Sequence, residues 1–275
     1  MESFFSFLEK RVDDCSSLLC IGLDPHIPDL KQASADAARD FCLNLVKQTS
    51  RYAAAFKPNA AFFEVFGADG WTALKDVISA INDESNRLGS RIPIVLDAKR
   101  GDIASTAEAY AKSAFENLGV DCITLSPYLG KDSIEPFLQN SEKGVFLLCK
   151  TSNPGSGDLQ DLMVDGPQPM PLYEHVAHLA QTWNTKNNIG LVVGATHPEA
   201  MERVRAAAPD LWFLAPGVGA QGGELEAALK AGLRKDGKGL LLPVSRGIAR
   251  AEKPGLAAAE LRDEILDVKR SWMRM

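Results

Sequence analysis

Three charged residues follow one short apolar segment at a spacing that could do chemistry. Residues 92–96 read IPIVL, and Asp97, Lys99 and Asp102 come next. If this segment is a strand that continues to Lys99, side chains two positions apart point to the same face, so Asp97 and Lys99 lie side by side. An ammonium beside a carboxylate keeps its charge, which favours a proton donor or fixed cation over a Schiff-base nucleophile. A purely structural ion pair would show the same spacing, so the pattern leaves both interpretations open.

Polar residues also end the other apolar segments of the chain. Asp24 and Lys57 end the first two, each directly before a proline. If both side chains point inward, Asp24 adds an acceptor for substrate hydroxyl groups, and Lys57 adds a second cation beside Asp97 and Lys99. Alternatively, Asp24 only begins a turn and Lys57 is a solvated strand end. The remaining polar residues at segment ends are Ser126, Ser152, Asn153, Thr196, His197, Gln221, Ser245 and Arg246. For Ser126, Thr196 and His197, an ordinary cap or loop position is the better interpretation.

Glycines and an arginine follow the last two apolar segments. Residues 216–223 read PGVGAQGG, and Ser245 and Arg246 follow the segment 240–244. Glycines let backbone N–H groups approach an anion, a helix N-terminus favours negative charge, and arginine can donate two hydrogen bonds to phosphate oxygens. The glycine spacing formally matches a dinucleotide fingerprint, but it does not follow the first strand, so a single phosphate is the better interpretation. A glycine-rich turn beside a surface arginine is the alternative.

Eight short apolar segments alternate with stretches of helical character. The segments are nearly continuous in apolar residues, as in parallel strands that are covered on both faces. This alternation predicts an α/β protein with a (β/α)8 TIM barrel, formed by residues 1–275 as a single domain. An open doubly wound sheet is the competing fold, because alternation alone does not show closure. The predicted strands are 18–23, 53–56, 92–96, 122–125, 145–149, 190–194, 211–214 and 240–244, and the clearest helices are 35–50, 104–118, 198–208, 223–233 and 256–271.

In such a barrel the carboxyl ends of the strands share one face, so the polar residues at the segment ends are expected to converge there. One stretch interrupts the alternation. Residues 155–171 contain three glycines and three prolines, and we expect a long irregular loop. A functional loop and a surface insertion are both open interpretations of it.

The composition excludes several classes of protein. The chain has 275 residues, of which 45% are hydrophobic and 24% charged, and this excludes disorder, collagen-like repeats and a coiled coil. The net charge of −6 disfavours a nucleic-acid-binding surface, and no apolar run approaches the roughly 18 residues of a membrane span. The N-terminus lacks the basic and apolar regions of a secretory signal. The five cysteines are widely spaced, so we expect no disulfide framework, no structural zinc and a cytoplasmic location.

Taken together, these segments resemble the orotidine 5'-monophosphate decarboxylase family, and in particular its longer-chain subgroup. The D-x-K-x-x-D core of residues 97–102 is the most specific part of the match. The resemblance runs along nearly the whole chain, through GLDP at 22–25, FKPN at 56–59, LDAKRGDI at 96–103, TSNPG at 151–155, APGVGAQGG at 215–223 and SRGI at 245–248.

The resemblance implies a lyase that converts orotidine 5'-monophosphate to uridine 5'-monophosphate in de novo pyrimidine biosynthesis. Its catalytic array would be Lys57, Asp97, Lys99 and Asp102, with the Lys99 ammonium stabilising a carbanion at C6 and then protonating it. Asp97 would lie near the departing carboxylate, where ground-state destabilisation and the positioning of Lys99 are both open roles. The family uses no metal and no organic cofactor.

The resemblance also implies the substrate contacts and the assembly. Asp24 and Lys57 would hold ribose hydroxyls, and Ser152 would read the pyrimidine. The chain would bind a pyrimidine nucleotide, but no nucleic acid and no membrane. It would form a homodimer in which Asp102 and Thr106 reach the neighbouring subunit's site. Gln221 and Arg246 would grip the phosphate, where a backbone N–H at Ser245 could also serve, and Pro216 would be a further substrate-binding residue.

Other functions fit part of this pattern. A related sugar-phosphate aldolase or decarboxylase shares the barrel and the D-x-K-x-x-D core but uses Mg²⁺ and an enediolate intermediate. A Schiff-base aldolase would use Lys99 as a nucleophile. A non-catalytic barrel that binds a phosphate ligand is the alternative from another class, although a binder has no need for alternating buried charges.

Overall fold

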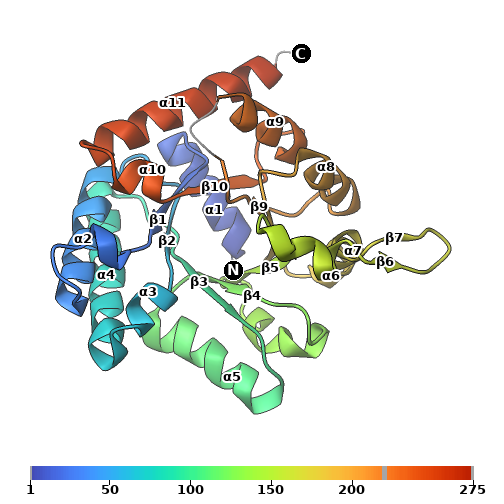
Figure 1. Ribbon diagram of the computed structural model, residues 1–275, viewed down its shortest axis with the longest axis horizontal. Coiled ribbons are helices and arrows are strands. Elements are labelled where there is room, and N and C mark those ends of the chain that lie inside the picture. Colours follow the sequence, from blue (N-terminus) through green and yellow to red (C-terminus); the bar gives the residue numbers. More distant parts are fainter. Residues whose placement is uncertain (1, 219–221, 274–275) are drawn as a thin grey trace.

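Eight parallel strands form the centre of the molecule (Figure 1). The computed structural model describes residues 2–218 and 222–273. The strands pair in the order β2-β1-β10-β9-β8-β5-β4-β3. Their bounds are β1 (Leu19–Leu23), β2 (Ala55–Pro58), β3 (Val95–Arg100), β4 (Cys122–Leu125), β5 (Gly144–Lys150), β8 (Ile189–Val193), β9 (Phe213–Leu214) and β10 (Leu240–Val244).

Bridges between β2 and β3 close this sheet into a barrel. Phe56 pairs with Ile94, and Asn59 pairs with Asp97, as isolated parallel bridges. The Phe56 N–H donates to the Pro93 carbonyl at 3.0 Å. Because the first and last strands of the order are joined in this way, the predicted TIM barrel is confirmed and the open doubly wound sheet is wrong.

All eight predicted strands are present, but β3 lies further along the chain than its apolar segment suggests. The sequence predicts a strand over 92–96, whereas β3 begins at Val95 and ends at Arg100. Pro93 has no N–H to donate to a neighbouring strand, and Arg100 still pairs with Leu125 of β4. Asp97 and Lys99 therefore belong to the strand itself, and only Asp102 of the motif lies in the loop after it.

Helices surround the barrel (Figure 1). The five clearest predictions are confirmed, except that the end of 104–118 is a π-helix over Ser113–Leu118. These helices are α2 (Ala35–Thr49), α5 (Ala104–Lys112), α8 (Pro198–Ala207), α9 (Gly222–Gly232) and α11 (Pro254–Met273). The sequence pattern missed α4 (Gly67–Leu88) and α7 (Leu172–Trp183). Shorter elements are α3 (Ala61–Glu64), α10 (Arg246–Ala249) and 3-10 turns at Ile27–Asp29, Lys131–Ser133 and Glu135–Leu138.

Local signals set several of the helix ends. The Ser34 hydroxyl accepts the Ala37 N–H at 3.2 Å and so caps the start of α2. Gly89 ends α4 with a φ of +64°, a left-handed conformation that glycine adopts without steric cost. Gly119 ends the π-helix after α5 in the same way, with a φ of +75°.

The strand–helix alternation does not predict α1 (Phe4–Cys15), which packs against the amino ends of the strands. Phe5 stacks parallel to Trp212, with ring centroids 6.3 Å apart, and meets Phe146 edge-on at 5.5 Å. The Phe4 N–H donates to the Ser141 carbonyl at 2.9 Å, just before β5. These buried aromatic rings close the base of the barrel.

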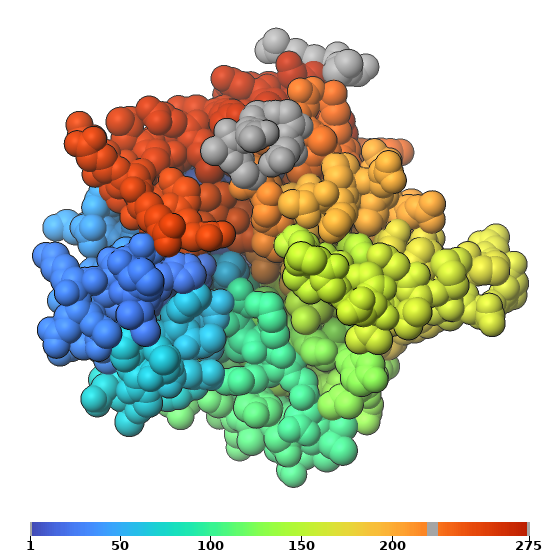
Figure 2. Space-filling view, viewed as in Figure 1, coloured from blue at the N-terminus to red at the C-terminus, as the bar shows by residue number. Residues whose placement is uncertain are grey.

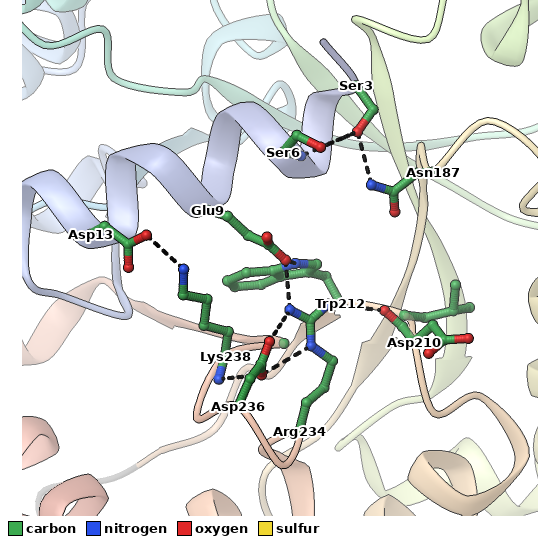
Figure 3. A network of polar contacts seen from close by, with 12 residues as sticks. Ser3, Ser6, Glu9, Asp13, Asn187, Asp210, Trp212, Arg234, Asp236 and Lys238 are labelled. Carbon is green, nitrogen blue, oxygen red and sulfur yellow. Dashed lines mark hydrogen bonds and ion pairs between the residues drawn. The ribbon is translucent and has the colours of Figure 1, made fainter.

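Polar contacts hold α1 against the turns at this base (Figure 3). Glu9 accepts hydrogen bonds from the Trp212 indole at 3.2 Å and from Arg234 at 2.6 Å. Lys238 donates to Asp13 at 2.6 Å. The helix is therefore joined to the segment between α9 and β10, which is remote from it in sequence.

The stretch 155–171 is not the irregular loop that its glycines and prolines predict. It contains most of a 3-10 turn (Pro154–Ser156), the short helix α6 (Gly157–Gln160) and an antiparallel hairpin of β6 (Met163–Val164) with β7 (Met170–Pro171). The prolines fall within or next to the hairpin's ends and connection, where a missing N–H is tolerated. The hairpin projects from the side of the barrel (Figures 1 and 2).

Two observations concern the cysteines and the helices as a whole. All five cysteines are free and buried. Across residues 2–218 and 222–273, no helix is both long enough and apolar enough to cross a membrane.

Gly190 makes close packing inside β8 possible. A Cβ at this position would lie 2.6 Å from a Phe146 ring carbon and 2.7 Å from the Trp212 carbonyl oxygen. The Trp212 carbonyl accepts the Leu191 N–H at 2.8 Å and cannot move away without losing that bond. We therefore expect Gly190→Ala to lower the free energy of unfolding by about 1–3 kcal/mol, measured by urea denaturation.

Gly166→Ala is the matched control, because a Cβ at Gly166 would meet no atom within 4 Å. This variant is expected to stay within about 0.5 kcal/mol of the unmodified protein. Equal losses in the two variants would contradict the packing argument.

Candidate active site

The carboxyl ends of the strands meet on the face seen in Figures 1 and 2. Helix α1, at the base, lies behind the strands in this view (Figure 1). Segments from the beginning, middle and end of the chain surround the centre of the near face (Figure 2). Residues far apart in sequence are therefore brought together at this mouth of the barrel.

At the mouth, each carboxylate oxygen of Asp97 accepts a hydrogen bond from a different lysine. Lys57 Nζ, from β2, lies 2.8 Å from Oδ2, and Lys99 Nζ lies 2.5 Å from Oδ1. The side chains of Lys57 and Asp97 are only 8% and 12% exposed, whereas that of Lys99 is 49% exposed. Lys99 is thus the member of this charged array that is accessible from the mouth.

The array keeps its buried members charged. Burial alone would raise the pKa of Asp97, but the charges of Lys57 and Lys99 and their hydrogen bonds outweigh burial and lower it to about 2. Burial alone would lower the pKa of Lys57, but the Asp97 and Asp24 carboxylates outweigh burial and raise it above its usual value. Asp97 and Lys57 are therefore both ionised at neutral pH.

Lys99 has a left-handed backbone conformation, with a φ of +48°. Pairing of β3 with β4 is regular up to Leu96 with Ile123 and resumes only at Arg100 with Leu125. The regular strand assumed from the sequence is therefore wrong here, because a bulge redirects the side chains. Asp97 and Lys99 still meet, but through an unusual backbone that costs free energy for any residue other than glycine.

The ends of β1 and β10 approach closely at Gly22. A Cβ on this glycine would lie 2.7 Å from Ser245 Cβ and 3.3 Å from Asp24 Oδ2. Asp24 Oδ1 and Ser245 Oγ are buried and have no hydrogen-bond partner among the described residues. Buried polar atoms without partners are costly, so this corner suits a ligand that brings hydroxyl or other polar groups.

Ser152 lies beside the ends of β8 and β9. A Cβ added to Gly194 would lie 3.1 Å from the Ser152 Cβ, and one added to Gly217 would lie 4.0 Å from it. The Pro216 carbonyl accepts the Ala195 N–H at 2.8 Å, which ties the loop after β9 to the end of β8. The structure thus brings Ser152 and the Pro216 loop together.

Arg246 is the first residue of α10, and its side chain is exposed. Arg250, directly after this helix, pairs with Asp29 at 3.1 Å and so joins it to the segment after β1. Gln221 lies outside the described residues, and its role stays a prediction.

Asp102 and Thr106 lie at the start of α5, apart from the ion pairs of Asp97. Asp102 Oδ1 accepts the Ile103 N–H at 2.8 Å, next to it in sequence. Thr106 is exposed on the surface of α5. Both positions are open to a neighbouring molecule on this side of the mouth.

Two buried polar residues at the mouth were not singled out from the sequence. Thr124 of β4 donates to Asp97 Oδ1 at 3.1 Å and accepts the Lys99 N–H at 2.9 Å. Lys150, at the end of β5, donates to Asp161 at 2.6 Å and fixes the segment that follows Ser152. The available signals were a hydroxyl inside the apolar segment CITL, and a lysine that ends its strand as Lys57 ends β2.

Residues 17–261 match the model of the orotidine 5'-phosphate decarboxylase / HUMPS family. The chain belongs to this family. The matched residues include Lys57, Asp97, Lys99 and Asp102. They also include the glycines described at the mouth, Gly22, Gly194 and Gly217.

Several orotidine 5'-phosphate decarboxylases are similar to the chain over most of its length. The protein of Roseiflexus castenholzii with this name is 48% identical, and the alignment covers 96% of this chain and 97% of that protein. The structure of Leishmania donovani OMP decarboxylase is 54% identical with a TM-score of 0.87, covering 98% and 99% of the two chains. Leishmania donovani UMP synthase is 56% identical with a TM-score of 0.88, but the match covers only 57% of that longer chain.

Because the pKa of Asp97 is lowered, the stability of this decarboxylase-family barrel depends on pH in the acid range. With a folded pKa of about 2 against the usual 3.8, the charged carboxylate stabilises the fold above pH 4, and this contribution is lost as pH falls toward 2. Between about pH 5 and pH 3, the free energy of unfolding should fall by about 1 kcal/mol more than in Asp97→Asn. Urea denaturation at each pH measures the difference.

The exposed Asp158 of α6 supplies the control for this experiment. Asp158→Asn should keep the acid response of the unmodified protein. An Asp97→Asn variant with that same response would show that the array does not set the acid sensitivity.

Proposed function

We propose that this chain decarboxylates orotidine 5'-monophosphate to uridine 5'-monophosphate, as a carboxy-lyase of pyrimidine biosynthesis. The observation that carries the proposal is the Asp97 carboxylate held between Lys57 and Lys99 at the mouth of a barrel of this family. A simple phosphate-binding barrel has no need for a buried anion that is fixed by two ammonium groups, because such burial is costly.

The reaction leaves a negative charge on C6 of the pyrimidine that the π system of the ring cannot delocalise. The bond between C6 and the carboxylate carbon breaks, CO2 leaves, and the electron pair stays on C6. A fixed Lys99 ammonium stabilises this carbanion and then transfers its proton to C6. With a side chain 49% exposed, Lys99 can regain a proton from solvent after product leaves.

The remaining site residues support the same substrate. Asp24 Oδ1, buried and without a partner among the described residues, suits a ribose hydroxyl near Lys57. Ser152, beside the Pro216 loop, suits the pyrimidine, and Ser245 with Arg246 suits the phosphate at the start of α10. We propose that Gln221 completes the phosphate site.

We further propose a homodimer in which Asp102 and Thr106 complete the site of the partner subunit. Exposed apolar side chains follow the neighbouring strands β2, β3 and β4, where they suit an interface between two copies. They are Val65 (60% exposed), Ile103 (53%), Tyr128 (81%) and Leu129 (48%). Both Asp102 and Thr106 lie on the same side of the mouth as Ile103.

We also propose that residues 1–275 act as one domain in the cytoplasm. The barrel uses strands from Leu19 to Val244, and α1 and α11 flank them. Five free, buried thiols suit a reducing compartment.

Turnover of orotidine 5'-monophosphate, followed by ultraviolet absorbance, tests the proposed function. We expect turnover by the unmodified protein and a loss of about 10⁴-fold or more in Lys99→Ala, because both the carbanion's counter-charge and its proton donor are removed. Binding of uridine 5'-monophosphate by Lys99→Ala should stay within about tenfold, because the phosphate and ribose contacts are intact.

Two controls separate the alternatives. Lys75→Ala changes an exposed lysine of α4 that is bonded to Asn117, and it should leave turnover unchanged. Turnover that persists in a strong chelator excludes a Mg²⁺-dependent relative. Near-normal turnover in Lys99→Ala, or none in the unmodified protein, would overturn the proposal.

Mixing inactive subunits tests the shared site. We expect Lys99→Ala and Asp102→Ala to be nearly inactive alone, whereas a purified heterodimer should recover about half of the unmodified activity, because in a two-fold dimer one of its two sites has both residues. Two different affinity tags isolate the heterodimer for the turnover assay. No recovery would show that Asp102 acts in its own subunit's site, and normal activity of Asp102→Ala alone would show that it has no role in turnover.

A further inference from the structure

The strand next to the array contains one buried hydroxyl, that of Thr124. Its side chain lies in β4 and is 1% exposed. Pairing of β3 with β4 passes from Leu96 opposite Ile123 to Arg100 opposite Leu125. Three residues of β3, which include Asp97 and Lys99, are therefore opposed by Thr124 alone.

This hydroxyl makes every hydrogen bond that it can. Thr124 Oγ1 accepts the N–H of Ala98 at 3.0 Å and the N–H of Lys99 at 2.9 Å. It lies 3.1 Å from Asp97 Oδ1. Backbone N–H groups can only donate, so the single hydroxyl proton is left for the Asp97 carboxylate. The direction of all three bonds is therefore fixed by chemistry.

Thr124 is itself held firmly in place. It pairs with Phe146 of β5, within a β4–β5 ladder that is regular from Cys122 to Leu125. A β-branched side chain also has few accessible rotamers, so its hydroxyl direction is restricted. The bulged strand β3 is thus fixed against a regular one.

The conformation of Lys99 depends on these bonds. With a φ of +48°, its backbone is unfavourable for a residue with a side chain. The bulge leaves the Ala98 and Lys99 N–H groups without carbonyl partners in β4, and Thr124 Oγ1 replaces those partners. Without the hydroxyl, two donors are unsatisfied and the strained backbone loses the contacts that maintain it.

We infer that Thr124 is a positioning residue for the decarboxylation: its hydroxyl fixes the bulge that aims the Lys99 ammonium and orients the Asp97 carboxylate. This inference rests on the proposed function, because it assigns Lys99 as the group that faces C6. Thr124 acts through its two neighbours and needs no contact with the substrate.

Three substitutions separate the hydroxyl from the volume of the side chain. Thr124→Val keeps the shape and removes the hydroxyl, Thr124→Ser keeps the hydroxyl, and Thr124→Cys is close in size to serine but is a weak hydrogen-bonding group. We expect kcat for orotidine 5'-monophosphate to fall about 10- to 100-fold in the valine and cysteine variants, with KM within about threefold. The serine variant should keep kcat within about fivefold.

Thr49→Val is the matched control. Thr49 is also fully buried, and its hydroxyl donates to the Leu45 carbonyl within α2 at 2.7 Å. Thr49→Val also removes a buried hydroxyl, but its one hydrogen bond lies within α2 and not at the array, so kcat and KM should both be unchanged. If Thr124→Val does not fold, the cysteine and serine variants make the same comparison.

The outcomes distinguish this inference from the proposed function. An unmodified protein that turns over the nucleotide, together with hydroxyl-free variants that lose kcat at constant KM, supports the positioning role. Normal kcat in the valine and cysteine variants, an equal loss in the serine variant, or a change confined to KM overturns it and leaves the proposed function standing. An unmodified protein without turnover overturns the proposed function instead.

Discussion

A single buried carboxylate, that of Asp97, holds the mouth of the barrel in order. Removal of this charge from water is expensive, and the expense is offset only because each oxygen meets an ammonium, Lys57 on one side and Lys99 on the other. Neither lysine can be lost without leaving a buried anion partly unpaired. The interaction also requires β2 and β3 to lie side by side, and the bridges Phe56–Ile94 and Asn59–Asp97 hold them there.

The opposite end of the barrel is held by aromatic packing and by hydrogen bonds. Aromatic rings from α1 fill the base, and Glu9 links that helix to Arg234 and Trp212 (Figure 3). The Arg205 guanidinium lies 3.6 Å from the centre of the Phe213 ring and donates to five carbonyls around the short strand β9. Stability is thus concentrated at the base and chemistry at the mouth, the usual division in such barrels.

Most of the fold could be read from the sequence because its signals are local. Buried parallel strands need continuous apolar segments, and the helices between them need caps such as Ser34. The failures at α1 and at the hairpin were non-local or came from turn chemistry. Helix α1 precedes the first strand and has no place in the alternation. The hairpin of β6 and β7 pairs across a glycine- and proline-rich segment whose composition by itself predicts a loop.

The sequence by itself determined which charged residues end the strands, because the D-x-K-x-x-D spacing and the family resemblance depend only on order along the chain. It also determined that they share one face, because parallel strands of a barrel all end there. Only the tertiary structure decided that Lys57 and Lys99 divide one carboxylate between them, and that Thr124 maintains a left-handed backbone at Lys99. The physical reason is that a bulge and a cross-strand hydroxyl contact arise from the register of two separate strands, which no local pattern encodes.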